Sequence, residues 1–232
     1  LLAECGRSPS LITGAGLHSL ITRGMIGNAC TGNSDLLVIE ADESDGSLVK
    51  YSPYISIFLN VSKDHKPVDE IVALFQELSR RSRFSFAGDG DMLSSSIEAD
   101  QTFGLKETAS LHPASVNLTP SYSESVIEGV TFHMPFPGMY MVENLLAALL
   151  VCRDLGCSPD DMARAVHTYE GISRRFDRIP SADGVTVIDD YAHNPDKITA
   201  ALKAAHPLSP PVFALFQPHR FGPTRFMLEE LA

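Results

Sequence analysis

The chain has 232 residues, 44% of them hydrophobic, and its 18 Lys and Arg against 29 Asp and Glu give a formal net charge of −11. This composition is typical of a globular protein and excludes a disordered or collagen-like chain. The acidity argues against nucleic-acid binding, because proteins that bind along a phosphate backbone usually carry a basic stripe.

No membrane partner is expected either, because the longest apolar run, residues 145–152, is far shorter than the roughly 20 residues that cross a bilayer. The 4 cysteines are scattered and predict reduced thiols rather than a disulfide framework. We therefore expect a cytoplasmic protein whose partners are small molecules. Because the chain begins at Leu1 without an initiator Met and ends within an expected helix, we also expect a fragment.

The first third of the chain alternates between strand and helix patterns. Short apolar runs at 36–39 and 54–59 predict strands that are covered on both faces. Apolar side chains at helical spacing predict a helix over 68–80, and residues 83–86 predict a third strand. This order of elements predicts a parallel sheet flanked by helices, with the first two strands in the same sheet.

The middle of the chain has a different pattern. Alternating polar and apolar residues within 99–135 predict a small antiparallel β portion. Helical spacing returns over about 142–155. Ser158 as N-cap and Pro159 in the first turn predict the start of a second helix.

A polar and basic segment at 173–175 predicts an interdomain hinge, because the pattern of buried strands starts again beyond it. Strand, helix and strand are expected, in that order, at 185–188, 195–205 and 212–216. The predicted fold class is therefore α/β, with a domain at 1–172 and the start of a second, Rossmann-like α/β domain at 173–232.

Polar clusters follow four of the predicted strands directly. Open parallel sheets bind their ligands at this place, outside the carboxyl ends of the strands. The clusters lie at 40–45, 60–65, 189–193 and 217–220. Glu40 suits Mg²⁺, which takes only one or two protein carboxylates, and His65 suits the same metal shell. The alternatives are a solvated acidic loop and a histidine without a role in binding.

The other clusters offer different chemistry. Asp189 and Asp190 suit ribose hydroxyls, and Arg220 suits a carboxylate or phosphate. Arg174 and Arg175 in the hinge suit a phosphoryl group in transfer. The alternative for each arginine is a surface ion pair worth about 0–1 kcal/mol.

Taken together, these motifs resemble the Mur ligase family in type and order, over nearly the whole chain. The resemblance rests on Glu40-Ala41-Asp42-Glu43-Ser44-Asp45, Asn60 with Asp64-His65, Gly171 with Arg174-Arg175-Phe176, Asp189-Asp190-Tyr191-Ala192-His193, and Gln217-Pro218-His219-Arg220.

The resemblance implies an ATP-dependent ligase of peptidoglycan synthesis, in which ATP phosphorylates a carboxylate and an amino acid attacks the acyl phosphate. The motifs are most similar to those of the member that joins L-alanine to UDP-N-acetylmuramate, and next to those of the muropeptide ligase. ATP and Mg²⁺ are the implied cofactors, and UDP-N-acetylmuramate and an amino acid are the implied substrates.

The resemblance also implies roles for individual residues. Those with an implied role are Glu40 and His65 as metal ligands, Arg174 and Arg175 at the phosphates, Asn144 at adenine, Asp190 at the ribose, and Tyr191, His193, His219 and Arg220 near the amino acid. Of these, Arg174, Arg175 and His193 are the implied catalytic residues.

The chain departs from the family pattern in several places, and Asn194 in addition stands where the family member for L-alanine usually has His. No Gly-Lys-Thr phosphate loop is found, Tyr140-Met141 replaces the usual His-Asn pair, and Pro223 stands where a second Arg is expected. A non-catalytic nucleotide-binding or regulatory relative therefore stays open, as do a muropeptide ligase and a ligase that adds an amino acid to another carboxylate acceptor, as folylpolyglutamate synthases do. Without the phosphate loop, we expect these residues alone to bind ATP weakly and to be inactive.

Overall fold

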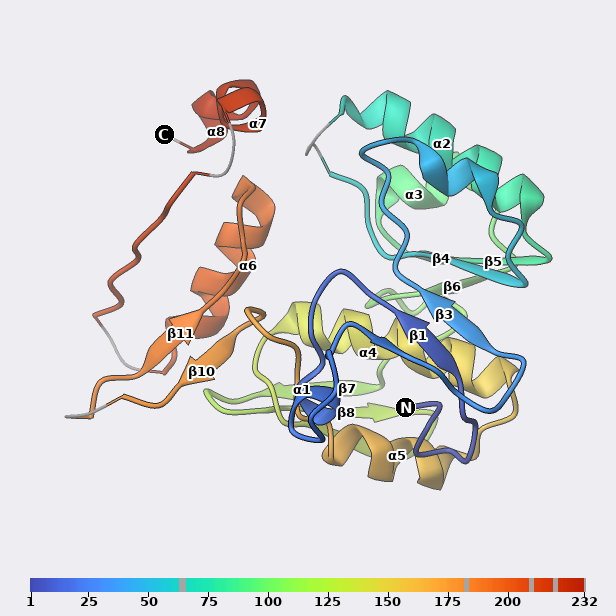
Figure 1. The fold of residues 1–232 in the computed structure, drawn as a ribbon, viewed down its shortest axis with the longest axis horizontal. Coiled ribbons are helices and arrows are strands. Elements are labelled where there is room, and N and C mark those ends of the chain that lie inside the picture. Colours follow the sequence, from blue (N-terminus) through green and yellow to red (C-terminus); the bar gives the residue numbers. More distant parts are fainter. Residues whose placement is uncertain (63–65, 182–183, 209–210, 219–220, 232) are drawn as a thin grey trace.

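A computed structural model describes residues 1–62, 66–181, 184–208, 211–218 and 221–231. In Figure 1, the elements up to residue 167 lie on both sides of the long helix α4 (Met139–Asp154), and the segments from β10 (Asp177–Ile179) onward lie to one side of them. Among the described residues, the strands form four small sheets.

The first sheet contains β1 (Ser10–Ile12), β2 (Ala29–Cys30) and β3 (Leu37–Ile39) in the order β2-β1-β3. β1 and β3 are parallel. The predicted strand at 36–39 is confirmed, but its predicted burial is wrong, because β3 lies at the edge of this sheet and Leu37 is 54% exposed. The short helices of this region are α1 (His18–Ile21) and the 3₁₀ helix η1 (Ser47–Lys50).

The second sheet is the predicted parallel sheet. It contains β4 (Ile55–Phe58), β5 (Phe84–Gly88) and β6 (Gln101–Phe103), all parallel, and α2 (Val68–Arg81) and α3 (Asp91–Ser96) lie beside it. Three details of the prediction are wrong. β6 lies in this parallel sheet and not in the antiparallel portion, and β3 and β4 lie in different sheets. The strand at 54–59 is not covered on both faces, because β4 is an edge strand and Ile57 is 40% exposed. A run of apolar residues identifies a strand but not its hydrogen-bonded neighbour, which depends on distant parts of the chain.

The antiparallel portion is confirmed as β7 (Ser115–Leu118), β8 (Ser123–Ile127) and β9 (Val130–Met134). Both expected helices are also present, as α4 (Met139–Asp154) and α5 (Pro159–His167). The Ser158 side chain caps α5 by accepting a hydrogen bond from the Asp161 amide at 3.2 Å. Leu146 and Leu150 of α4 are fully buried in the main core, and each such side chain contributes about 1.5–3 kcal/mol by burial.

The C-terminal part differs most from the prediction. Its elements are β10 (Asp177–Ile179), β11 (Val187–Asp189), α6 (Pro195–Ala205), α7 (Phe221–Phe226) and α8 (Leu228–Leu231). α6 is confirmed, but β11 begins later than expected and pairs antiparallel with β10, not within a parallel sheet. Residues 212–216 form no strand, and Phe213 is 90% exposed. An apolar run becomes a strand only when a neighbour accepts its hydrogen bonds, and no described strand adjoins this segment. The domain boundary at 172/173 stays a prediction.

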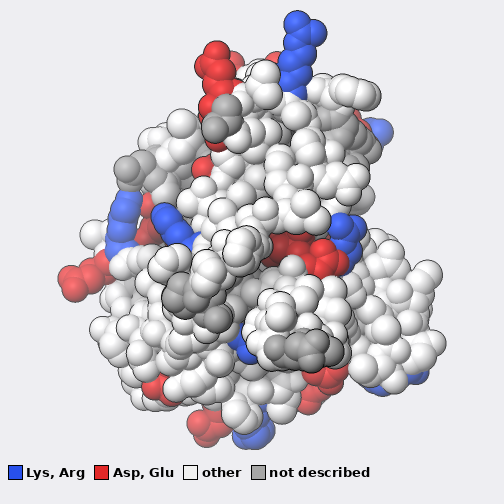
Figure 2. Space-filling model, turned by 90° about the vertical axis from the view of Figure 1, so that its left-hand side faces the viewer, with Lys and Arg blue, Asp and Glu red and all other residues white. Residues whose placement is uncertain are grey.

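The distribution of charged side chains and the state of the cysteines agree with the expectations from composition. Lys and Arg side chains are interspersed with Asp and Glu on the face drawn in Figure 2. All 4 cysteines carry free thiols, as expected. In the part of the chain that the structure describes, no helix is long and apolar enough to span a bilayer.

Candidate functional site

Glu40 directly follows β3, and its carboxylate is held by the end of β1. Glu40 Oε2 accepts hydrogen bonds from Thr13 Oγ1 at 2.6 Å and from the Gly14 amide at 2.7 Å. The Glu40 amide in turn donates to the Ile12 carbonyl at 2.9 Å, which extends the parallel pairing of the two strands. The carboxyl ends of β1 and β3 therefore meet, and they fix the direction of the Glu40 side chain.

The second oxygen of Glu40 suits a magnesium ion. Glu40 is exposed, and no described residue donates a hydrogen bond to its Oε1. Among the described residues, no group of three or more His, Cys, Asp and Glu side chains is placed to hold a metal. The single carboxylate of Glu40 is compatible with Mg²⁺, which takes one or two protein carboxylates and keeps several waters. The pairing of Glu40 with His65 stays a prediction, because His65 lies outside the described residues.

A short loop, residues 13–17, connects Glu40 to the predicted hinge. Gly14 contacts Glu40, and the Gly16 carbonyl accepts a hydrogen bond from the Ser173 amide at 2.8 Å. Leu17 and Ile172 form an isolated antiparallel bridge beside it. A stretch of three residues spans at most about 11 Å, so the Glu40 carboxylate and the Ser173 amide lie within about 16 Å of each other. The acidic cluster and the hinge thus belong to one region of the molecule.

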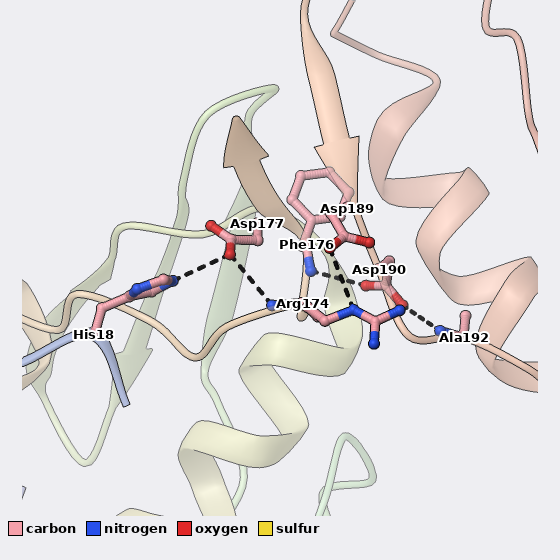
Figure 3. Close-up of polar contacts among 7 residues, drawn as sticks. All are labelled: His18, Arg174, Phe176, Asp177, Asp189, Asp190 and Ala192. Atoms are coloured by element: carbon pink, nitrogen blue, oxygen red, sulfur yellow. Dashed lines mark hydrogen bonds and ion pairs between the residues drawn. The ribbon is translucent and has the colours of Figure 1, made fainter. Parts of the chain in front are cut away.

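The backbone around the predicted hinge, residues 172–176 and called the hinge from here on, is unusual, and two carboxylates hold it in place (Figure 3). Arg174 and Phe176 have φ angles of 58° and 49°, in the left-handed region that side chains other than Gly rarely adopt. Asp177 accepts from the Arg174 amide at 3.2 Å, and Asp190 accepts from the Phe176 amide at 2.8 Å. Each left-handed residue costs about 1–3 kcal/mol and persists only where its surroundings hold it.

The hinge arginines lie over one aromatic ring. The guanidinium carbons of Arg174 and Arg175 are 4.9 Å and 5.9 Å from the centre of the Tyr191 ring. Arg174 also pairs with Asp189 at 3.3 Å, whereas no described carboxylate pairs with Arg175. The Tyr191 and His193 rings are 5.2 Å apart. The structure therefore brings together five residues with predicted roles: Arg174, Arg175, Asp190, Tyr191 and His193.

The Asp190 carboxylate accepts hydrogen bonds from two backbone amides, one in the hinge and one after β11. Its Oδ2 accepts from the Phe176 amide and its Oδ1 accepts from the Ala192 amide, each at 2.8 Å (Figure 3). Asp190 therefore joins the hinge to the segment after β11. Each carboxylate oxygen keeps a second lone pair, and the predicted contact with ribose stays a prediction.

Helix α4 forms a further wall of the region. Tyr140, in its first turn, is largely buried, and burial, together with the nearby Asp190, raises the pKa of its hydroxyl. Asn144 is exposed and lies one turn further along the same face of α4. Among the described residues, no hydrogen bond joins the Asn144 side chain to the hinge, and its predicted role at adenine stays a prediction.

Sequence reasoning missed Thr13, Asp177 and the structural bonds of Asp190. Thr13 carries no local signal, because its importance comes from a strand pairing with β3. The predicted substrate-binding residues His219 and Arg220 lie outside the described residues. Asn194, after the His193 motif, is buried and caps α6 by accepting from the Lys197 amide at 2.9 Å.

Comparisons with known proteins agree with the motif order. The family model of the Mur ligase middle domain matches residues 18–152, and that of the Mur ligase, glutamate ligase domain matches residues 174–232. The UDP-N-acetylmuramate–L-alanine ligase of Nostoc punctiforme is 33% identical over 249 residues, which cover 100% of this chain and 50% of the relative. The enzyme of the same name from Solibacter usitatus is 32% identical over 250 residues, covering 100% and 52%.

Solved structures give the same result. The UDP-N-acetylmuramate–alanine ligase MurC of Thermotoga maritima matches with a TM-score of 0.77 and 26% identity, over 89% of this chain and 49% of that one. The murein peptide ligase of Psychrobacter arcticus shares the fold, with a TM-score of 0.64 and 20% identity over 88% and 50%. The chain spans about half the length of these relatives.

Proposed function

Because this chain belongs to the Mur ligase family, we propose that it forms part of an ATP- and Mg²⁺-dependent ligase of peptidoglycan synthesis. The proposed reaction joins L-alanine to the carboxylate of UDP-N-acetylmuramate. ATP phosphorylates that carboxylate, and the amine of the amino acid displaces the phosphate from the acyl phosphate. The similarity to the L-alanine ligases of Nostoc punctiforme and Solibacter usitatus supports this choice of amino acid.

The loop at 13–17 is the observation that carries the proposal. It bonds to the Glu40 carboxylate at Gly14 and to the hinge at Gly16. An anionic group that suits a cation and a pair of arginines that suit phosphates thus lie on either side of one short loop. Phosphoryl transfer between two anions requires this combination, since its catalysis is mostly positioning and neutralisation of charge.

The site residues that the structure describes have different roles in the proposed reaction. Glu40 holds Mg²⁺, which neutralises phosphate oxygens when bound. Arg175 faces the transferred phosphoryl group, because no described carboxylate neutralises its guanidinium and the Tyr191 ring supports it. Arg174 supports the backbone turn and pairs with Asp189. Tyr191 and His193 lie on the amino-acid side, and Asn144 on the adenine side.

The experiment measures phosphate release by the protein encoded by the whole reading frame, with ATP, Mg²⁺, UDP-N-acetylmuramate and L-alanine. Release that needs all four components supports the proposal, and Arg175→Ala lowers the rate whereas Arg178→Ala, a nearby arginine on β10, leaves it unchanged. Release with a muropeptide in place of L-alanine indicates a muropeptide ligase. Nucleotide binding without turnover on any acceptor indicates the non-catalytic relative.

A further inference from the structure

His18 contacts the hinge on both of its sides. Its amide donates to the Gly171 carbonyl at 3.2 Å, just before the hinge. Its ring Nε2 lies 3.2 Å from Asp177 Oδ2, just after the hinge (Figure 3). The side chains are only 30% and 26% exposed, so water screens this contact less than at an open surface. One residue of α1 thus closes a loop around residues 172–176.

Asp177 transmits this contact to the hinge backbone. The same Oδ2 that faces His18 also accepts from the Arg174 amide at 3.2 Å. Arg174 is one of the two hinge residues with a left-handed backbone. In Figure 3 the Asp177 carboxylate stands between the His18 ring and the Arg174 amide. Ser173 adds a backbone bond to Gly16 next to it.

We propose that His18 and Asp177 are positioning residues, which hold the hinge in one conformation and so fix where the Arg175 guanidinium stands. The backbone of Arg174 sets the direction in which the next residue leaves the turn. If the Arg174 amide loses its acceptor, the left-handed turn relaxes and Arg175 leaves the face of Tyr191. The positioning role at the phosphates rests on the proposed function, but the effect on the hinge does not.

Backbone amide exchange at Arg174 in the 232-residue chain tests the proposal. Asp177→Ala speeds exchange at this amide by about tenfold or more, because the amide loses its carboxylate acceptor. His18→Ala speeds it by about threefold, and His18→Gln, which keeps a donor near the position of Nε2, stays within about twofold of wild type. Glu124→Ala is the matched control, because it removes a second His–carboxylate pair, with His133 at 3.9 Å, away from the hinge.

Two further measurements separate positioning from a general loss of structure. Exchange at the amides of α4 reports whether each variant is folded. If Asp177→Ala is unfolded, the comparison of His18→Ala with His18→Gln decides the proposal, because neither substitution removes the acceptor of the Arg174 amide. In the Asp177→Ala background, His18→Ala adds nothing, because His18 acts through Asp177. Unchanged exchange at Arg174 in His18→Ala, or fully additive effects in the double variant, overturns the proposal.

The protein from the whole reading frame links the hinge to the reaction. His18→Ala lowers kcat while the KM for ATP stays within about twofold, and His18→Gln restores kcat, since Arg175 acts on the group in transfer. A changed KM with an unchanged kcat contradicts the positioning role. If no variant, wild type included, turns over ATP, the proposed function fails, and the exchange data still decide the role of His18 and Asp177 at the hinge.

Discussion

Replacing Asp190 with Ala removes the acceptor for two backbone amides on opposite sides of the hinge. Phe176 and Ala192 each donate to this carboxylate at 2.8 Å. The Phe176 side chain is 1% exposed, so water does not easily replace the lost acceptor. Asp190→Ala therefore leaves one amide in a buried position without a partner and a second amide in a partly exposed one.

The expected cost follows from the two bonds. A buried donor that loses its partner costs about 1–3 kcal/mol, and a bond that water replaces in part costs about 0.5–1.5 kcal/mol. The local free energy of opening therefore falls by about 1.5–4.5 kcal/mol, and exchange at the Phe176 amide speeds up by about tenfold or more. Asp190→Asn keeps one oxygen acceptor and has about half of this effect on the free energy.

Amide exchange followed by NMR measures this directly, with Asp189→Ala as the matched control. Asp189 is the preceding residue, but among the described residues its carboxylate forms an ion pair with the exposed Arg174 side chain, and we expect a change of about 0–1 kcal/mol. Unchanged exchange at Phe176 in Asp190→Ala, together with weaker nucleotide binding, would refute the structural role and favour the contact with ribose.

Three further predictions concern the metal ligand, the nucleotide and the thiols. In the protein from the whole reading frame, Thr13→Val raises the Mg²⁺ concentration for half-maximal activity by about tenfold, because the hydrogen bond from Thr13 to the Glu40 carboxylate is lost. Thr13→Ser keeps the hydroxyl and leaves this Mg²⁺ concentration unchanged. Equal values for the two variants contradict the role of the hydroxyl. The 232-residue chain binds ATP weakly in calorimetry, since it contains no Gly-Lys-Thr loop, and a sub-micromolar Kd would count against the reasoning. Burial raises the pKa of the Cys152 thiol from 9.0 to about 12. The protonated thiol therefore favours the folded state, and this contribution to the free energy of unfolding is lost as pH rises from about 9 to about 12. In urea unfolding, the free energy of unfolding of Cys152→Ala falls less over that pH range than that of wild type, and an equal fall contradicts the assignment.

The longer helices, α2, α4, α5 and α6, could be predicted from sequence because their signals are local, whereas the short helices α1, α3 and α7 were missed. In α5, Ser158 and Pro159 mark the start by themselves, and the structure shows the cap. In α2, the spacing of apolar residues selects the buried positions, among them Ile71 and Leu78. Neither inference requires knowledge of distant residues.

Strand partners and side-chain bonds across the hinge could not be predicted in this way. Phe213 lies in an apolar run that predicts a strand, but burial of that run depends on neighbours that its own sequence does not specify. β10 was missed because its residues, Asp177–Ile179, carry no apolar alternation, although they pair with β11, the next strand along the chain. The bond from Thr13 to Glu40 depends on the register of β1 against β3, and motif order cannot show it.

Paramagnetic broadening by Mn²⁺ in place of Mg²⁺, with ATP, tests the central claim most directly in the protein from the whole reading frame. If Glu40 and the hinge flank one nucleotide site, the bound ion broadens the amide signals of Gly14, Ser173 and Arg175 together, and Glu40→Gln removes the broadening. Broadening at Gly14 with unaffected signals from the hinge would place the arginines away from the phosphates and contradict the account.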